Sequence, residues 1–177
     1  MNDSELEFTE VSRTRGYDGY RKIDHVMFRD PRGIEHTYDI RIGGDSIAVV
    51  AITPDQQVVL ARQYRHGAGR IMLELPGGGI EPGEDPLAAG MRELLEETGY
   101  AGEGAYVGAQ WQSGYANYQG HVAVVTNATP VAELSLDDAE FIEVVLMPLA
   151  EFREHIRTGE FTDAGKAYRA LDHLGLL

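Results

Sequence analysis

The chain has 177 residues, 43% of them hydrophobic, which suits a globular protein with a substantial core. Its formal net charge of −14 argues against a nucleic-acid partner, because duplex affinity depends on Lys and Arg that neutralise phosphates. The absence of cysteine excludes disulfides and thiol chemistry. The N-terminus lacks the regions of a signal peptide, and no apolar run approaches the ~20 residues of a membrane helix. We therefore expect a cytoplasmic protein without a membrane partner.

The first half of the chain predicts two pairs of strands. Residues 20–29 and 35–42 have strand character and flank Asp30-Pro31-Arg32-Gly33, which is a strong turn signal. The mostly apolar segments 46–52 and 58–64 predict two further strands, with which the sheet of the core begins.

A glycine-rich turn and a helix follow. Asp85 is a good N-cap with proline after it, and Gly99 suits a left-handed C-cap, so we expect a helix of about four turns between them. On a helical wheel, Glu93, Glu96 and Glu97 fall together on one side. The side expected to pack against the core carries Leu87, Met91, Leu94, Leu95 and Thr98.

The grouping of three glutamates on one side of a helix requires an explanation. Acidic neighbours three or four residues apart repel by a few tenths of a kcal/mol per pair, so helix stability does not select them. A divalent cation would remove the repulsion, and oxygen-rich sites suit magnesium or manganese. A backbone carbonyl of the glycine-rich turn could complete the metal shell. Arg92 and Glu84 could form an ion pair that fixes the turn to the helix.

The spacing of these residues resembles a known signature. From Gly78 the chain reads glycine, five residues, Glu84, seven residues and then RELLEETGY, which begins at Arg92. This resembles the Nudix hydrolase signature at every fixed position, and only Tyr100 departs, where an aliphatic residue is commoner. The resemblance implies a diphosphate hydrolase with the α/β (α+β) fold of that family, an α/β/α sandwich with a mixed β-sheet.

The resemblance also implies roles for single residues. Glu93, Glu96 and Glu97 would hold Mg²⁺, with Mn²⁺ as a possible substitute. The Gly77 carbonyl would be a further ligand. The residues with a structural role in the motif would be Gly78, Glu84, Arg92 and Gly99.

Two flanking segments narrow the resemblance to a branch of the family. Arg62-Gln63-Tyr64-Arg65 followed by Glu74-Leu75-Pro76 resembles the ADP-ribose pyrophosphatase branch, whose substrates are ADP-ribose and related nucleoside diphosphate sugars. Gly114 stands where that branch often has proline, which predicts a relaxed substrate preference. The candidate substrate-binding residues are Arg62, Arg65, Glu74 and Tyr115.

The last third of the chain supplies the catalytic candidates. Segments 105–112 and 120–126 read as strands, and an acidic loop precedes a further strand at 141–147. Related hydrolases often take their general base from such a loop, so we expect Glu140 in this role, then Asp138. Glu96 is a further catalytic candidate. Two helices, 148–158 and 163–174, are expected to close the chain.

The expected organisation is a Nudix hydrolase domain over residues 44–177 and an N-terminal region of antiparallel strands over 1–43. In this branch such strands form a dimerisation region, so a homodimer is expected. Two alternatives stay open: a Nudix protein acting on other nucleoside diphosphate or triphosphate derivatives, and a non-catalytic Nudix-fold nucleotide sensor.

Overall fold

The computed structural model describes residues 2–177, which divide by packing into two compact units. The N-terminal unit contains the chain up to Gly44 together with residues 111–119. The core unit contains residues 45–110 and 120–177. The N-terminal strands therefore share a unit with a distant loop.

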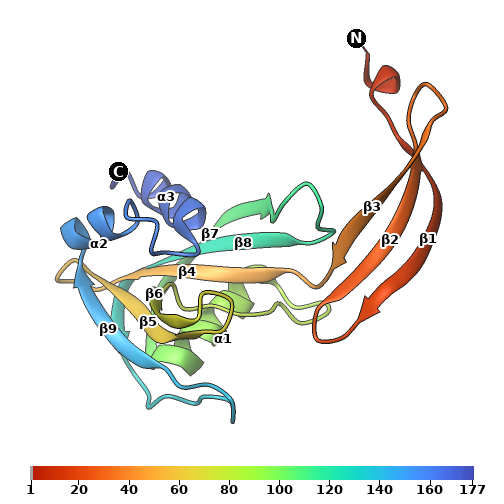
Figure 1. Cartoon of the computed structure of the whole chain (residues 1–177). Coiled ribbons are helices and arrows are strands. Elements are labelled where there is room, and N and C mark those ends of the chain that lie inside the picture. Colours follow the sequence, from red (N-terminus) through yellow and green to blue (C-terminus); the bar gives the residue numbers. More distant parts are fainter. Residues whose placement is uncertain (1) are drawn as a thin grey trace. The chain divides into compact units, whose positions relative to one another are not determined.

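The N-terminal unit is built on an antiparallel sheet, which follows a short 3-10 turn at Asp3–Glu5 and is coloured red to orange in Figure 1. Its strands, in spatial order, are β1 (Thr9–Asp18), β2 (Lys22–Arg29) and β3 (Glu35–Ile42). The strands β2 and β3 were predicted. The strand β1 was not, because all ten of its residues are exposed and no alternation of buried side chains marks it.

The predicted turn between β2 and β3 is held by Asp30. Its carboxylate accepts 2.9 Å hydrogen bonds from the backbone N–H groups of Arg32 and Ile34. The Arg32 guanidinium also donates to it at 2.7 Å. This contact and the bond from Ile34 keep the pKa of the buried Asp30 carboxyl well below its usual range.

The loop 111–119 joins this unit through β3. The backbone N–H of Arg41 donates to the Tyr115 carbonyl at 2.9 Å. The ring of Tyr115 is stacked on Tyr38, with centroids 6.1 Å apart. These contacts explain why a loop so far along the chain packs with the N-terminal strands.

The core unit contains a mixed sheet with the spatial order β6-β5-β4-β8-β7, and β9 pairs with β5 (Figure 1). It is mixed because β4 runs parallel to β8 and antiparallel to β5. The strands are β4 (Ser46–Ile52), β5 (Gln57–Arg65), β6 (Arg70–Glu74), β7 (Tyr100–Trp111), β8 (Gln119–Pro130) and β9 (Glu143–Pro148). Of these, only β6 was absent from the predicted strands.

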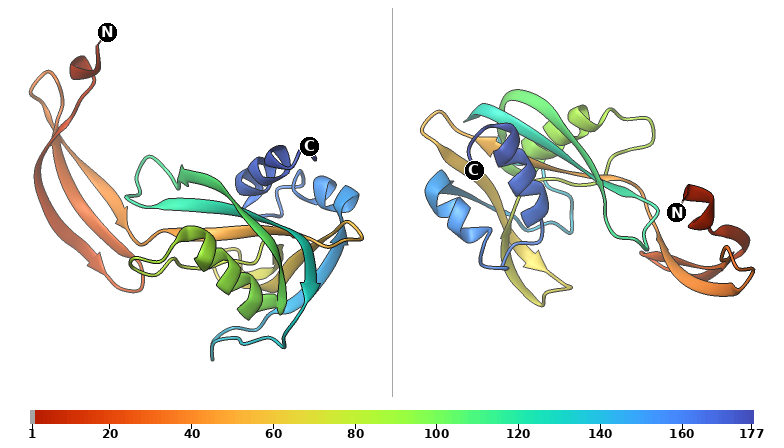
Figure 2. Two further views of the ribbon diagram at one scale, coloured as in Figure 1. Left: turned by 180° about the vertical axis from the view of Figure 1, so that it is seen from behind. Right: turned by 90° about the horizontal axis from the view of Figure 1, so that it is seen from above.

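Helices cover both faces of this sheet. Alternate residues of β4 enter two different hydrophobic clusters: Val50 packs with residues of α2 (Leu149–His155) and α3 (Ala164–His173), and Val49 packs with α1 (Pro86–Thr98). Figures 1 and 2 show α1 on one side of the sheet and α2 with α3 on the other. The predicted α/β/α sandwich is confirmed. Within residues 2–177, no helix combines the length and apolar character that a membrane span requires.

The helix α1 has the predicted ends. The Asp85 side chain accepts from the Ala88 N–H at 3.0 Å, and Gly99 is left-handed, with φ of 72°. The buried side differs from the predicted one, because Leu95 is 37% exposed whereas Glu97 is buried. The helix therefore turns one of its acidic residues into the protein.

Candidate active site

The glycine-rich turn lies against β4. The Gly78 carbonyl accepts a 2.9 Å hydrogen bond from the Ile47 N–H. A Cβ atom on Gly77, whose φ is 154°, would stand 2.1 Å from the Ile47 carbonyl oxygen. A Cβ atom on Gly78 would stand 2.5 Å from the carboxylate of Glu93. Both positions need glycine for close approach, one to the strand and one to the acidic side chain.

The turn also contacts the last turn of α1. The N–H of Gly77 donates to Glu97 Oε2 at 2.8 Å, whereas the Pro76 and Gly78 carbonyls bond to β4. The sequence expects a metal ligand at the Gly77 carbonyl, and the N–H of the same residue already bonds to Glu97.

Glu97 is a buried carboxyl with an altered affinity for protons. It is 5% exposed, and burial raises its pKa from 4.5 to about 8. The Gly77 hydrogen bond and the charge of Arg65 lower this pKa, whereas the charges of Glu93 and Glu140 raise it. Three carboxylates thus lie close enough to interact, and a cation among them would relieve both the burial cost and the repulsion.

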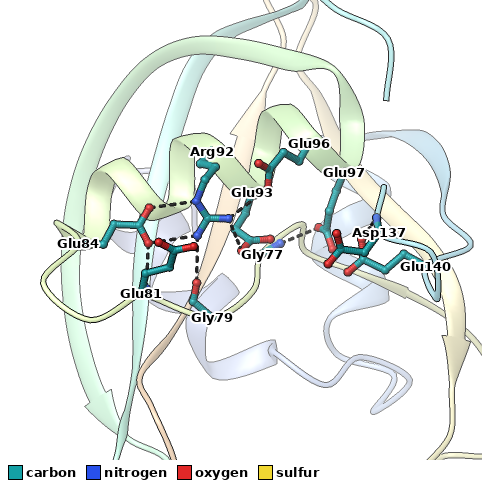
Figure 3. A network of polar contacts seen from close by, with 10 residues as sticks. All are labelled: Gly77, Gly79, Glu81, Glu84, Arg92, Glu93, Glu96, Glu97, Asp137 and Glu140. Atoms are coloured by element: carbon teal, nitrogen blue, oxygen red, sulfur yellow. Dashed lines mark hydrogen bonds and ion pairs between the residues drawn. The ribbon is translucent and has the colours of Figure 1, made fainter. Parts of the chain in front are cut away.

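Arg92 holds the other acidic residues of the motif, as Figure 3 shows. Its Nε donates to Glu84 at 3.0 Å, and its Nη2 donates to the Gly79 carbonyl at 3.1 Å. Its Nη1 donates to Glu93 at 2.8 Å and to Glu96 at 3.1 Å. A single guanidinium therefore joins the glycine-rich turn to two successive turns of α1.

The ion pair expected between Arg92 and Glu84 is present. Glu84 also accepts a 2.9 Å hydrogen bond from the Glu81 N–H, which closes the loop ahead of α1. The Arg92 hydrogen bond lowers the pKa of Glu84, so this carboxylate stays charged.

The acidic loop before β9 reaches the same cluster. Its Ser135 N–H donates to the Glu96 carbonyl at 2.9 Å, and its Asp137 N–H donates to Glu140 Oε2 at 3.1 Å. Figure 3 places Asp137 and Glu140 beside Glu97. Asp138 is exposed. Of the two expected bases, Glu140 is the one whose charge acts on Glu93 and Glu97.

A comparison with known proteins accounts for this arrangement. The NUDIX domain family matches residues 44–170. The chain belongs to the NUDIX family. The ADP-ribose pyrophosphatase of Bacillus subtilis (strain 168) is 33% identical over 177 residues, covering 97% of this chain and 94% of that protein.

A second relative has a different name. The methanol dehydrogenase activator of Bacillus methanolicus is 31% identical, covering 88% of this chain and 84% of that protein. In fold, the chain resembles the crystal structure of an ADP compounds hydrolase, with a TM-score of 0.83 and 21% identity over 99% of this chain and 100% of that one.

The Nudix family generally needs a divalent metal, and the residues here fit one. The donors near the glycine-rich turn are carboxylates and a carbonyl, which suit hard cations. No three His, Asp or Glu side chains within residues 2–177 already surround one ion position. Arg92 holds Glu93 and Glu96. Binding a cation would therefore require these two carboxylates to share or leave that contact.

The predicted substrate contacts on β5 and β6 have protein partners. Arg62 is paired with Glu143 of β9 at 2.5 Å, and its side chain is about half exposed. Glu74 is 1% exposed, and its carboxylate accepts from Arg65 Nε and from the Thr162 hydroxyl. Both oxygens of Glu74 are thus engaged inside the protein, which does not suit direct contact with a substrate. Sequence reasoning missed Thr162, because it lies 88 residues from Glu74.

Tyr115 belongs to the N-terminal unit, where it is 57% exposed and stacked on Tyr38. One face of its ring therefore has an aromatic partner already. Its role as a substrate contact stays a prediction.

Proposed function

We propose that this Nudix protein hydrolyses the pyrophosphate bond of ADP-ribose or related nucleoside diphosphate sugars, and that Mg²⁺ is its cofactor. The products would be a nucleoside monophosphate and a sugar phosphate. The observation that carries the proposal is that Glu97 lies beside Glu140 and bonds to Gly77, while Glu93 closely approaches Gly78 of the same glycine-rich turn. The name of the Bacillus subtilis relative supports the substrate class.

The metal ligands in this proposal are Glu93, Glu96 and Glu97, with the Gly77 carbonyl. A divalent cation held by these residues would shield the charge of the pyrophosphate and lower the pKa of water. The protein's own contribution is to present charged oxygens on a rigid helix. Arg92 and the Gly77 N–H hold all three carboxylates in place before substrate binds.

Glu140 would orient and deprotonate the attacking water as the general base. Its carboxylate is steadied by the Asp137 N–H, and its loop is tied to α1 through Ser135. Asp138 is the second candidate. Glu96, whose side chain is 43% exposed, is a further candidate.

Arg65 is the proposed phosphate contact. Glu74 engages its Nε, and 44% of the side chain is exposed, so the guanidinium edge is available to an anion. A diphosphate bound here would meet positive charge from two sources, the Arg65 guanidinium and the cation that the carboxylates would hold. An acidic protein needs such local positive charge to bind an anion. Arg62, already paired with Glu143, is the weaker candidate.

We also propose a homodimer formed with the N-terminal strand region, 1–43. The strand β1 stands at the edge of its sheet, and both Val11 on this strand and Phe8 just before it are exposed. Unpaired strand edges of this kind are usually covered. The cytoplasm stays the predicted compartment.

A substrate screen tests the activity. The purified protein is incubated with Mg²⁺ and ADP-ribose, other nucleoside diphosphate sugars or nucleoside triphosphates, and the phosphate-bearing products are identified. We expect AMP and ribose 5-phosphate from ADP-ribose, and a loss of turnover of at least about 100-fold in Glu140→Gln. Cleavage of triphosphates alone, or tight nucleotide binding without turnover, would overturn the proposal in favour of one of its alternatives.

A further inference from the structure

The segment just before α3 is fixed to the rest of the core unit by each of its residues in turn. Glu160 pairs with Arg70 of β6 at 2.7 Å. Phe161 is 5% exposed and packs edge-on against Phe152, with ring centroids 5.7 Å apart. We call residues 160–163 the C-terminal clasp.

The second half of the clasp is held by polar contacts. The Thr162 hydroxyl donates to Glu74 Oε1. Asp163 pairs with Lys166 at 3.0 Å, and Lys166 is only 6% exposed. The contacts of Phe161 and Asp163 hold the backbone on both sides of Thr162, from which its hydroxyl reaches Glu74.

Glu74 passes this constraint to Arg65. Its other oxygen, Oε2, accepts from Arg65 Nε. A carboxylate that is 1% exposed needs a partner at each oxygen, so the Thr162 hydroxyl and the guanidinium together set its orientation. Glu74 stands three residues before Gly77, whose N–H donates to Glu97, so Arg65 is joined to the chain segment that contacts the proposed metal-binding carboxylates.

We propose that Thr162 is a positioning residue, which acts through Glu74 to hold the Arg65 guanidinium in place for a diphosphate. The inference rests on the proposed function for its substrate class, but it assigns a role to a part of the chain that lies outside the Nudix signature. A flexible arginine loses conformational entropy when it binds a ligand, whereas a guanidinium that is already fixed loses less. The clasp would therefore contribute to affinity for the diphosphate without touching it.

The test compares three variants with the wild type. Thr162→Val removes the hydroxyl at nearly constant shape, and Thr162→Ser keeps it. Thr126→Val is the matched control, because this partly exposed threonine lies on β8 of the same unit and its side chain has no described hydrogen bond to the clasp. Circular dichroism and melting curves verify folding, and Thr162→Ala replaces the valine variant if that one does not fold.

The first readout is the Kd for inorganic pyrophosphate with Mg²⁺, measured by calorimetry. We expect Thr162→Val to weaken binding about tenfold, as for a misplaced charged hydrogen-bond donor, with the serine variant and the control within about twofold of wild type. In an Arg65→Lys background, the valine substitution should add about twofold or less, because coupled residues are not additive. An unchanged Kd in Thr162→Val, an additive effect, or no binding by the wild type would overturn the clasp proposal.

The second readout separates positioning from a loss of folded protein. Positioning predicts a rise in KM for ADP-ribose that exceeds the fall in kcat, whereas loss of active protein lowers kcat at constant KM and would contradict the proposal. Failure of the proposed function is distinguishable: a wild type that binds pyrophosphate but cleaves none of the nucleotides contradicts the activity, while the comparison of Kd values still decides the clasp.

Discussion

The N–H of Gly77 donates a 2.8 Å hydrogen bond to the carboxylate of Glu97, which joins the glycine-rich turn to the last turn of α1. This one contact places a backbone group with a required glycine conformation beside the most buried acidic side chain of the motif. Its two residues come from segments twenty positions apart, and their geometry decides how the acidic cluster titrates and what it can bind.

Replacing Glu97 with Gln should separate activity from folding. The substitution keeps the shape and the Gly77 hydrogen-bond acceptor but removes the charge, so we expect turnover to fall by at least about 100-fold with Mg²⁺ while the fold persists. The measurement is kcat at increasing Mg²⁺, with the exposed Glu151→Gln as a control that should behave like wild type. If Glu97→Gln is as active as the wild type at saturating Mg²⁺, Glu97 is not a metal ligand.

The stability of the metal-free protein should depend on pH through Glu97. Its pKa is about 8 in the folded chain and 4.5 ordinarily, so the folded state holds this proton more tightly. The resulting stability is fully present below about pH 4.5 and is lost as pH rises through 8. We therefore expect the Tm in EDTA to decline between pH 5 and 8 and to recover with Mg²⁺ at pH 8.

The same melting curves contain their own control. In Glu97→Gln, the decline between pH 5 and 8 should flatten and the Mg²⁺-dependent recovery should shrink. Below pH 5 the trend reverses, because Asp30 and Glu84 have lowered pKa values and lose stabilising charge as they are protonated. A Tm in EDTA that rises steadily from pH 5 to 8 would be inconsistent with a buried, proton-binding Glu97.

Arg92→Lys should destabilise the protein although it preserves the charge. A lysine cannot hold both oxygens of Glu84 and reach Glu93 and the Gly79 carbonyl together, so we expect a loss of roughly 1–3 kcal/mol in the free energy of unfolding. Denaturant titration provides the value. Arg157→Lys, whose pair with Glu154 is exposed, is the matched control and should change stability by less than about 0.5 kcal/mol.

The N-terminal strands should support a dimer in solution. Light scattering on the full chain at micromolar concentration should return a mass near twice the 19.5 kDa of one chain. A charged residue on the exposed edge strand, as in Val11→Asp, should shift the mass toward one chain, because an apolar contact would then bury a charge. A monomer mass for the wild type rejects the prediction.

Substrate preference should be relaxed. Gly114 has open space around the position of a Cβ atom, and the Gly114 N–H donates none of the described hydrogen bonds of its loop, so a proline there would remove none of them. We expect kcat/KM for ADP-ribose, ADP-glucose, GDP-mannose and UDP-glucose to differ by less than about 1,000-fold, and Gly114→Pro to widen the spread. An advantage of ADP-ribose above about 1,000-fold, or about 4 kcal/mol, contradicts this.

Local sequence signals accounted for much of the fold and the family. The bounds of α1 followed from Asp85 and Gly99, because capping depends on neighbouring backbone groups only. The strand β4 was predicted from its short apolar run, which is bounded by turns, and not from an alternation of apolar and polar residues. The fixed spacing of the motif led to the family. The strand β1 was not predicted, because a strand that is exposed along its whole length has no alternation of apolar and polar residues.

Tertiary structure decided which side chains are buried and with which partners. The wheel put Leu95 inside and Glu97 on the acidic face, yet Glu97 is buried and Leu95 is partly exposed, since the glycine-rich turn and β4 supply what faces the helix. Glu74 was expected to contact the substrate, and the structure shows its carboxylate buried and bonded to Arg65 and Thr162. Both outcomes depend on contacts between residues far apart in the chain, and a sequence pattern contains no distances between such residues.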